Sequence, residues 1–213
     1  MGDPLGLILL FPPLLFALTV HEAAHAYAAL RLGDPTAKLL GRLSLNPLVH
    51  LDWLGTLIFL IPPHIGWAKP VPVDVRYLRH PRRDMMWIAL AGPVSNVLLA
   101  LVFGTILRVI VSIPHEMSIA ESALVRMVHW SVVLNLSLAV FNMIPIFPLD
   151  GSKVLSGLLS PNAAARFQTL ESVGPFLLLG LIMLGSFSGV SVIGMIVFPV
   201  VRHVGGFFTG GLL

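Results

Sequence analysis

Long apolar stretches with few polar positions dominate the chain, and their lengths predict its architecture. Five of them approach or exceed the roughly 18–20 residues that cross a bilayer as a helix; they are residues 5–30, 85–112, 124–146, 170–184 and 190–208. A further hydrophobic run at 51–63 is too short to span, which is typical of a re-entrant or interfacial segment. The pattern therefore predicts an all-α polytopic membrane protein with about five transmembrane helices.

The segment between the first two spans predicts a small β or re-entrant element. Residues 37–46 mix polar and apolar positions with a partial period of two, which favours a short strand or hairpin arm. Residues 66–75, GWAKPVPVDV, alternate prolines with valines, and proline cannot donate within a central strand, so an exposed edge or extended segment is expected. With no repeat and no flexible linker, we expect one membrane domain over 1–213, with a core at about 5–158 and two accessory helices at about 170–208.

Composition and charge agree with this prediction. The chain is 56% hydrophobic and only 11% charged, whereas an ordinary soluble domain is about 25% charged. Eight of the 13 Lys and Arg residues lie between Arg31 and Arg83, and none lies in 113–122. By the positive-inside tendency, 31–83 is cytoplasmic and the N-terminus lies outside a plasma membrane. Because the basic residues follow topology, no nucleic-acid partner is expected.

The first span contains three ionisable residues in the pattern HEAAH. His21 and His25 stand at i and i+4, share one helix face and can chelate one metal ion. Glu22, the next residue, can reach a water bound to that ion, as in the H-E-x-x-H arrangement of zinc proteases. Burying ionisable groups in an apolar helix is expensive, which favours a functional role.

A third ligand must be His, Asp or Glu, because the chain contains no cysteine. The first and third spans both run from outside to inside, so Asp150 returns to the same side as the histidines at a comparable depth. We therefore predict one Zn²⁺ held by His21, His25 and Asp150, with Glu22 as general base. Asn142 is a candidate oxyanion donor, with helix capping or an interhelical hydrogen bond as the alternative.

Three motifs occur in the order found in a known family. HEAAH, GPVSN at 92–96 and NMIPIFPLDG at 142–151 resemble the site-2 protease family of intramembrane zinc metalloproteases, in its compact prokaryotic type without PDZ or CBS domain. The resemblance implies a three-helix catalytic core, zinc held by the two histidines and the aspartate, and cleavage of transmembrane substrates near the cytosolic face. Asn96, within the second motif, is expected to serve helix packing.

Two other classes of function fit the same residues. Intramembrane His and Asp also mark ion pathways, so a membrane zinc transporter or channel is one alternative. A catalytically inactive membrane regulator is the other. A carrier has no need of a general base beside its ligands, so Glu22 discriminates between carrier and protease. The expected partners are transmembrane protein substrates and the lipid bilayer, and homo-oligomer formation stays open.

Overall fold

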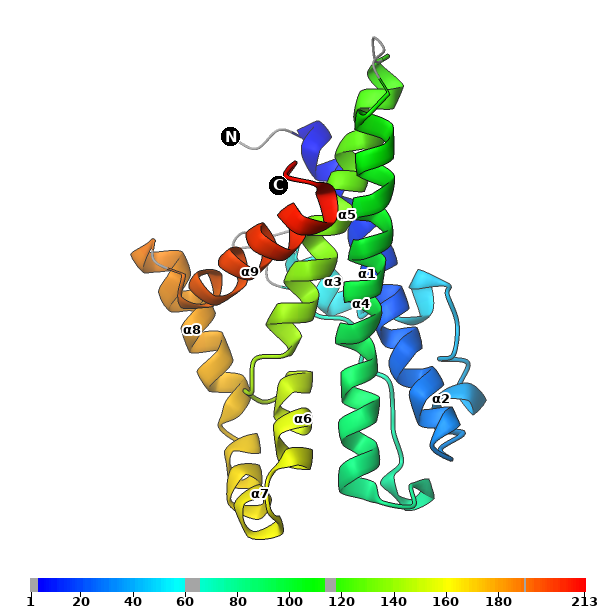
Figure 1. The fold of residues 1–213 in the computed structure, drawn as a ribbon. Coiled ribbons are helices and arrows are strands. Elements are labelled where there is room, and N and C mark those ends of the chain that lie inside the picture. Colours follow the sequence, from blue (N-terminus) through cyan, green and yellow to red (C-terminus); the bar gives the residue numbers. More distant parts are fainter. Residues whose placement is uncertain (1–3, 60–65, 114–117, 190) are drawn as a thin grey trace.

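The computed structural model describes residues 4–59, 66–113, 118–189 and 191–213. Over these residues the chain is helical, as predicted, and its longer helices stand side by side around α4 (Figure 1). The α-helices are α1 Pro4–Arg31, α2 Thr36–Leu39, α3 Trp53–Phe59, α4 Pro81–Val111, α5 Ile119–Asn142, α6 Asp150–Leu158, α7 Pro161–Gln168, α8 Gly174–Ser188 and α9 Val192–Thr209. Short 3-10 turns are η1 Pro47–Val49, η2 Val75–Tyr77 and η3 Thr169–Glu171.

Four helices of the described residues are long and apolar enough to cross a membrane: α1, α4, α5 and α9. A fifth span is reached if 161–171 and 174–188, which meet at a bend of 61°, count as one. The prediction of about five transmembrane helices is therefore confirmed, with the fourth expected span being the bent one. The chain is a multi-pass membrane protein.

The helices α1, α4 and α5 pack against one another and form the centre of the molecule. Alanines on α1 and α4 are fully buried where these helices meet their neighbours, among them Ala17, Ala29 and Ala100. Small residues let helix backbones approach closely. The resulting van der Waals packing stabilises helix pairs in a bilayer, where the hydrophobic effect does not favour association. On the other side of α5, Val132 and Leu136 pack against Val197 and Val201 of α9.

The end of α5 follows from its prolines. The helix begins at a capping box, in which the Ser118 hydroxyl accepts the backbone N–H of Glu121 and the Glu121 carboxylate accepts that of Ser118. It ends at Asn142, four residues earlier than the expected boundary at 146, because Pro145 lacks an N–H and restricts the residue before it. The turn that follows contains a cis Phe147–Pro148 bond and leads into α6, whose first residue is Asp150.

The predicted β element is largely wrong. Residues Thr36–Leu39 form α2 instead of a strand, and among the described residues the β structure is limited to one isolated antiparallel bridge, Leu51 to Ala68. A two-residue pairing is below what a free hairpin needs for stability. Residues 66–74, named the strap below, form no helix, and Ala68 of the bridge lies among them. The short run at 51–63 forms α3, while its end from residue 60 lies outside the described residues.

Candidate metal centre

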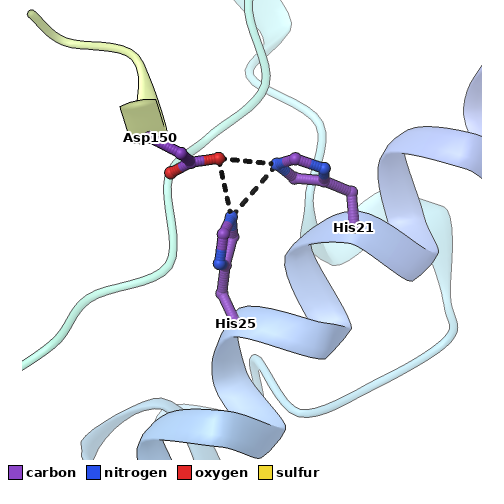
Figure 2. Close-up of side chains that lie close together, drawn as sticks. All are labelled: His21, His25 and Asp150. Atoms are coloured by element: carbon purple, nitrogen blue, oxygen red, sulfur yellow. Dashed lines mark hydrogen bonds and ion pairs between the residues drawn. The ribbon is translucent and has the colours of Figure 1, made fainter. Parts of the chain in front are cut away.

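His21, His25 and Asp150 come together at one point inside the bundle (Figure 2). The Nε2 atoms of His21 and His25 lie 3.0 Å apart. Asp150 Oδ2 lies 3.1 Å from His21 Nε2 and 3.2 Å from His25 Nε2. All three side chains are buried, with 4%, 8% and 8% of their residue surface exposed. The structure therefore brings together the three residues predicted as metal ligands, although Asp150 stands 129 positions after His21.

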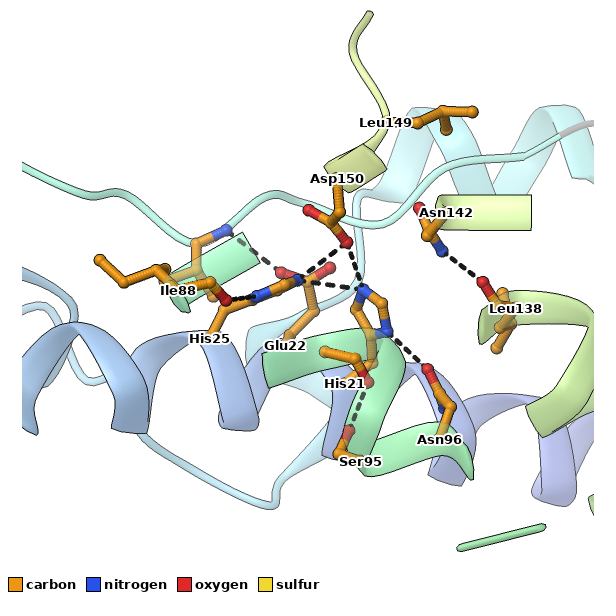
Figure 3. Close-up of polar contacts among 12 residues, drawn as sticks. His21, Glu22, His25, Ile88, Ser95, Asn96, Leu138, Asn142, Leu149 and Asp150 are labelled. Atoms are coloured by element: carbon orange, nitrogen blue, oxygen red, sulfur yellow. Dashed lines mark hydrogen bonds and ion pairs between the residues drawn. The ribbon is translucent and has the colours of Figure 1, made fainter. Parts of the chain in front are cut away.

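The protonation of the two rings follows from their outer hydrogen bonds. His25 Nδ1 donates to the Ile88 carbonyl over 2.7 Å, and His21 Nδ1 lies 2.5 Å from Asn96 Oδ1 (Figure 3). A backbone carbonyl oxygen and an amide oxygen can only accept hydrogen bonds, so each neutral imidazole ring carries its proton on Nδ1. Each Nε2 then offers a lone pair to the centre, and outer partners of this type orient metal-binding histidines.

A metal cation would stabilise three acceptors in such close contact. Two imidazole lone pairs and a carboxylate within 3.2 Å of one another repel unless positive charge lies among them, and the site is too buried for water to screen them. A tetrahedral zinc ion about 2.0–2.1 Å from each donor would separate the donors by about 3.3 Å. The donor set, its spacing and its burial therefore fit zinc.

Two glycines shape the site. A Cβ on Gly92 of α4 would lie 2.5 Å from His25 Nε2 and 2.6 Å from His21 Nε2, so only glycine leaves room for the two rings at this point. A Cβ on Gly151 would collide with the backbone carbonyls of Met143 and Ile144. Because Gly151 has no side chain, α6 can begin in close contact with the end of α5. This contact sets the position of the preceding residue, Asp150.

Glu22 lies beside the histidines and contacts the strap. It is half-buried, and its Oε2 accepts the backbone N–H of Val71 over 3.2 Å. Pro70 and Pro72 flank Val71 and have no N–H, so Val71 is the donor of this stretch. The buried Arg42 holds the strap from the other side by donating to the Lys69 and Pro70 carbonyls.

The two asparagines of the motifs both lie near the site. Asn142, the candidate oxyanion donor, is half-buried beside the site, and its amide nitrogen donates to the Leu138 carbonyl of its own helix over 3.0 Å (Figure 3). Asn96, expected to serve only helix packing, hydrogen-bonds His21. The signal that could have found Asn96 was its position one turn after Gly92 in an apolar helix, where a polar side chain needs a partner.

Comparison with known proteins agrees with the geometry. Residues 107–184 match the peptidase family M50. A Bacillus subtilis protein named "Putative zinc metalloprotease YwhC" is 41% identical over 177 residues, which cover 82% of this chain and 80% of the relative. No solved structure matches the chain significantly.

Two more distant relatives carry similar names. "Putative zinc metalloprotease Rip2" of Mycolicibacterium smegmatis is 29% identical, over 72% of this chain and 58% of its own. "Zinc metalloprotease MJ0392" of Methanocaldococcus jannaschii is 28% identical, over 75% of this chain and 37% of its own. The extent of the similarity to the Bacillus protein decides the assignment: this chain belongs to peptidase family M50, the site-2 protease family, and is a membrane zinc metalloprotease.

Proposed function

We propose that this protease hydrolyses transmembrane segments of other proteins within the bilayer, close to the cytosolic face of the plasma membrane. The supporting observation is the depth of the candidate metal centre. His21 and His25 stand ten and six residues before the end of α1 at Arg31, which puts them about 9–15 Å inside the helix end. A peptide bond cleaved there comes from a substrate in the membrane.

The orientation rests on charge. Arg79, Arg82 and Arg83 are exposed around the start of α4, and the adjacent Arg31 ends α1. Lys and Arg concentrate on cytoplasmic segments, so this end of the bundle is assigned to the cytosol and the N-terminus to the outside. The inner half of α1, which carries the histidines, then lies nearer the cytosolic face.

His21, His25 and Asp150 are the proposed zinc ligands, and Glu22 is the proposed general base. Zinc held there supplies a Lewis acid and lowers the pKa of a bound water toward about 7. The Val71 N–H holds one carboxylate oxygen of Glu22, which leaves Oε1 to take the proton from the attacking water. Glu22 then delivers that proton to the leaving amine.

Asn142 is the proposed donor to the developing oxyanion. A neutral amide adds no charge to the membrane interior, and it stabilises negative charge that exists only in the transition state. In the structure its nitrogen is engaged with Leu138, so this role requires a rotation of the side chain when substrate is bound. The cost is about one ordinary hydrogen bond, which the charged partner offsets.

A helical substrate must be unwound before attack, and the loop at 42–46 offers an edge to hold it. The Ser44 carbonyl faces inward and accepts His50 Nε2 over 2.8 Å. Among the described residues, no group is hydrogen-bonded to the backbone N–H of Leu43 or Leu45. The chain bends at Leu43 and Leu45, so pairing with an extended substrate segment requires this loop to straighten. The strap is the poorer edge, because its Lys69 and Val71 N–H groups are already used.

A groove runs along this edge. A cavity of about 350 Å³ lies between α1 and the loop, lined on α1 by Val20, Ala23 and Tyr27 and on the loop by Leu43 and Leu45. Val20 and Ala23 stand on either side of His21 and Glu22 in the sequence, so an extended segment in the groove passes close to Glu22. The lining is apolar, which suits side chains from a transmembrane helix.

The test uses purified full-length protein in lipid vesicles with a model transmembrane helix that carries helix-breaking residues in its cytosolic half. The wild type is expected to cut it, and Glu22→Gln to retain zinc while cleavage falls by about 10²–10⁴-fold. Mass spectrometry of the products gives the cleavage position. Cleavage in the outer half, or equal cleavage of a soluble unfolded protein, would refute the proposed depth.

A further inference from the structure

Two buried asparagines extend the hydrogen bonding of His21 into α5. Asn96 of α4 and Asn135 of α5 are both 0% exposed. Asn96 Nδ2 donates to Asn135 Oδ1 over 2.7 Å, and Asn135 Nδ2 donates to the Ser131 carbonyl over 2.8 Å. Burying two amides is costly unless their groups are paired, and here the pairs form one chain from Ser131 to His21.

The direction of this chain is determined at its ends. The Ser131 carbonyl can only accept, so the nitrogen of the Asn135 amide faces it and the oxygen faces Asn96. The Asn96 amide has a second constraint, because its nitrogen also donates to the Ala17 carbonyl of α1 over 3.2 Å. The oxygen of Asn96 is therefore turned toward His21 Nδ1, which must donate.

A reversed Asn96 amide would disable His21 as a metal ligand. Its NH₂ group would face Nδ1, which would then have to accept, and the ring proton would move to Nε2. A protonated Nε2 has no lone pair for a metal. Because the neutral ring has only these two tautomers, the orientation of the Asn96 amide decides which nitrogen faces the site.

We propose that Asn135 is a positioning residue of the metal site, which acts through Asn96 by holding the metal-binding tautomer of His21. Its side chain is hydrogen-bonded to Asn96 and Ser131 and not to a candidate ligand, and it lies on α5, whereas the candidate ligands lie on α1 and α6. The inference rests on the proposed role of His21 as a zinc ligand. A purely structural role, as polar contact between helices, would affect stability without affecting the tautomer.

The first measurement is zinc affinity by chelator competition on purified full-length protein. Asn135→Leu, of similar volume, is expected to weaken zinc binding about 10-fold or more, the range seen for partners outside the ligand shell. Asn135→Asp can still accept from Asn96 and is expected to bind zinc within about threefold of wild type. Thr209→Val is the control, since it also removes a fully buried polar group, at the end of α9. Asn135→Ala replaces the leucine variant if that does not fold.

A double variant separates tautomer control from packing. A carboxylate in place of the Asn96 amide has two equivalent oxygens that both accept. It therefore presents an acceptor to His21 Nδ1 in either orientation. Asn96→Asp/Asn135→Leu is therefore expected to bind zinc more tightly than Asn135→Leu alone, although it carries more changes in the core. Nitrogen-15 spectra of the histidine rings in zinc-free protein are expected to show the Nδ1–H form of His21 in the wild type and a mixture in Asn135→Leu.

The outcomes are distinct. Zinc binding by Asn135→Leu equal to that of wild type, or no recovery in the double variant, would overturn the proposal. If Thr209→Val loses as much affinity as Asn135→Leu, the effect is one of general stability and the proposal is likewise refuted. His21→Ala tests the proposed function separately: unchanged zinc binding there would refute the ligand assignment itself.

Discussion

Gly92→Ala is the substitution that tests the geometry of the metal centre most directly. The added methyl would lie 2.5 Å from His25 Nε2 and 2.6 Å from His21 Nε2, whereas ordinary contacts begin at 3.4 Å. For the methyl and the ring nitrogens to reach an ordinary contact distance, the rings must move away by roughly 0.8–0.9 Å. A zinc site tolerates a change of only about 0.2 Å in its ligand distances. At least one histidine is then lost as a ligand.

We expect zinc affinity to fall by at least about 100-fold, or about 2.7 kcal/mol. The fold should survive, because one extra methyl in a packed interior costs about 1–3 kcal/mol. The assay is chelator competition for zinc, with thermal unfolding of the zinc-free proteins measured in parallel. The variant should be inactive against the model transmembrane substrate at zinc concentrations that saturate the wild type.

Gly104→Ala is the matched control on the same helix. Its methyl would lie 2.8 Å from the Phe208 Cβ, so it introduces a similar collision away from the histidines. Gly180→Ala, with nothing within 4 Å of the added atom, reports the effect of the substitution alone. Wild-type zinc affinity in Gly92→Ala, or an equal loss in Gly104→Ala, would refute the inferred arrangement of the rings.

Four further results are expected. Asn142→Ala should keep its zinc and lose about 10²–10³-fold in turnover; unchanged turnover would exclude Asn142 as the oxyanion donor. Gly151→Ala should displace Asp150 and weaken zinc binding, while a bound metal at wild-type affinity would contradict the tight start of α6. Removing zinc should lower the melting temperature, since saturation at 100 times Kd stabilises by about 2.7 kcal/mol; identical melting with and without zinc would exclude a bound ion in the folded state. The hydrogen bonds from the Arg76 guanidinium lower the pKa of Asp74 to about 2, so the pair stabilises the fold above the usual pKa of about 4 and this contribution is lost as pH falls toward 2. Arg76→Ala should return the Asp74 titration, followed by NMR, to about 4, and an unmoved titration would contradict the pairing.

The membrane architecture could be predicted from the sequence because it depends on local composition. A helix in lipid satisfies its own backbone, so length and apolarity alone mark the spans, and α1, α4, α5 and α9 were found where expected. The candidate ligands His21 and His25 were equally local, since residues four positions apart on a helix share a face. Asp150 followed from topology, because two spans running the same way end on the same side of the bilayer.

What the sequence could not determine depends on contacts between distant segments. Residues 37–46 read as a strand because they alternate, yet in the described part of the chain no strand is paired with them and residues 36–39 form α2 instead. Asn96 read as packing, because nothing local indicates that His21 lies 2.5 Å away. The membrane-spanning helices and the types of the candidate metal ligands could therefore be read from the sequence alone. Which nitrogen of each ring faces the site, and that a glycine stands against both rings, became visible in the folded chain, because the tautomer and the clearance depend on groups 63 to 75 positions away.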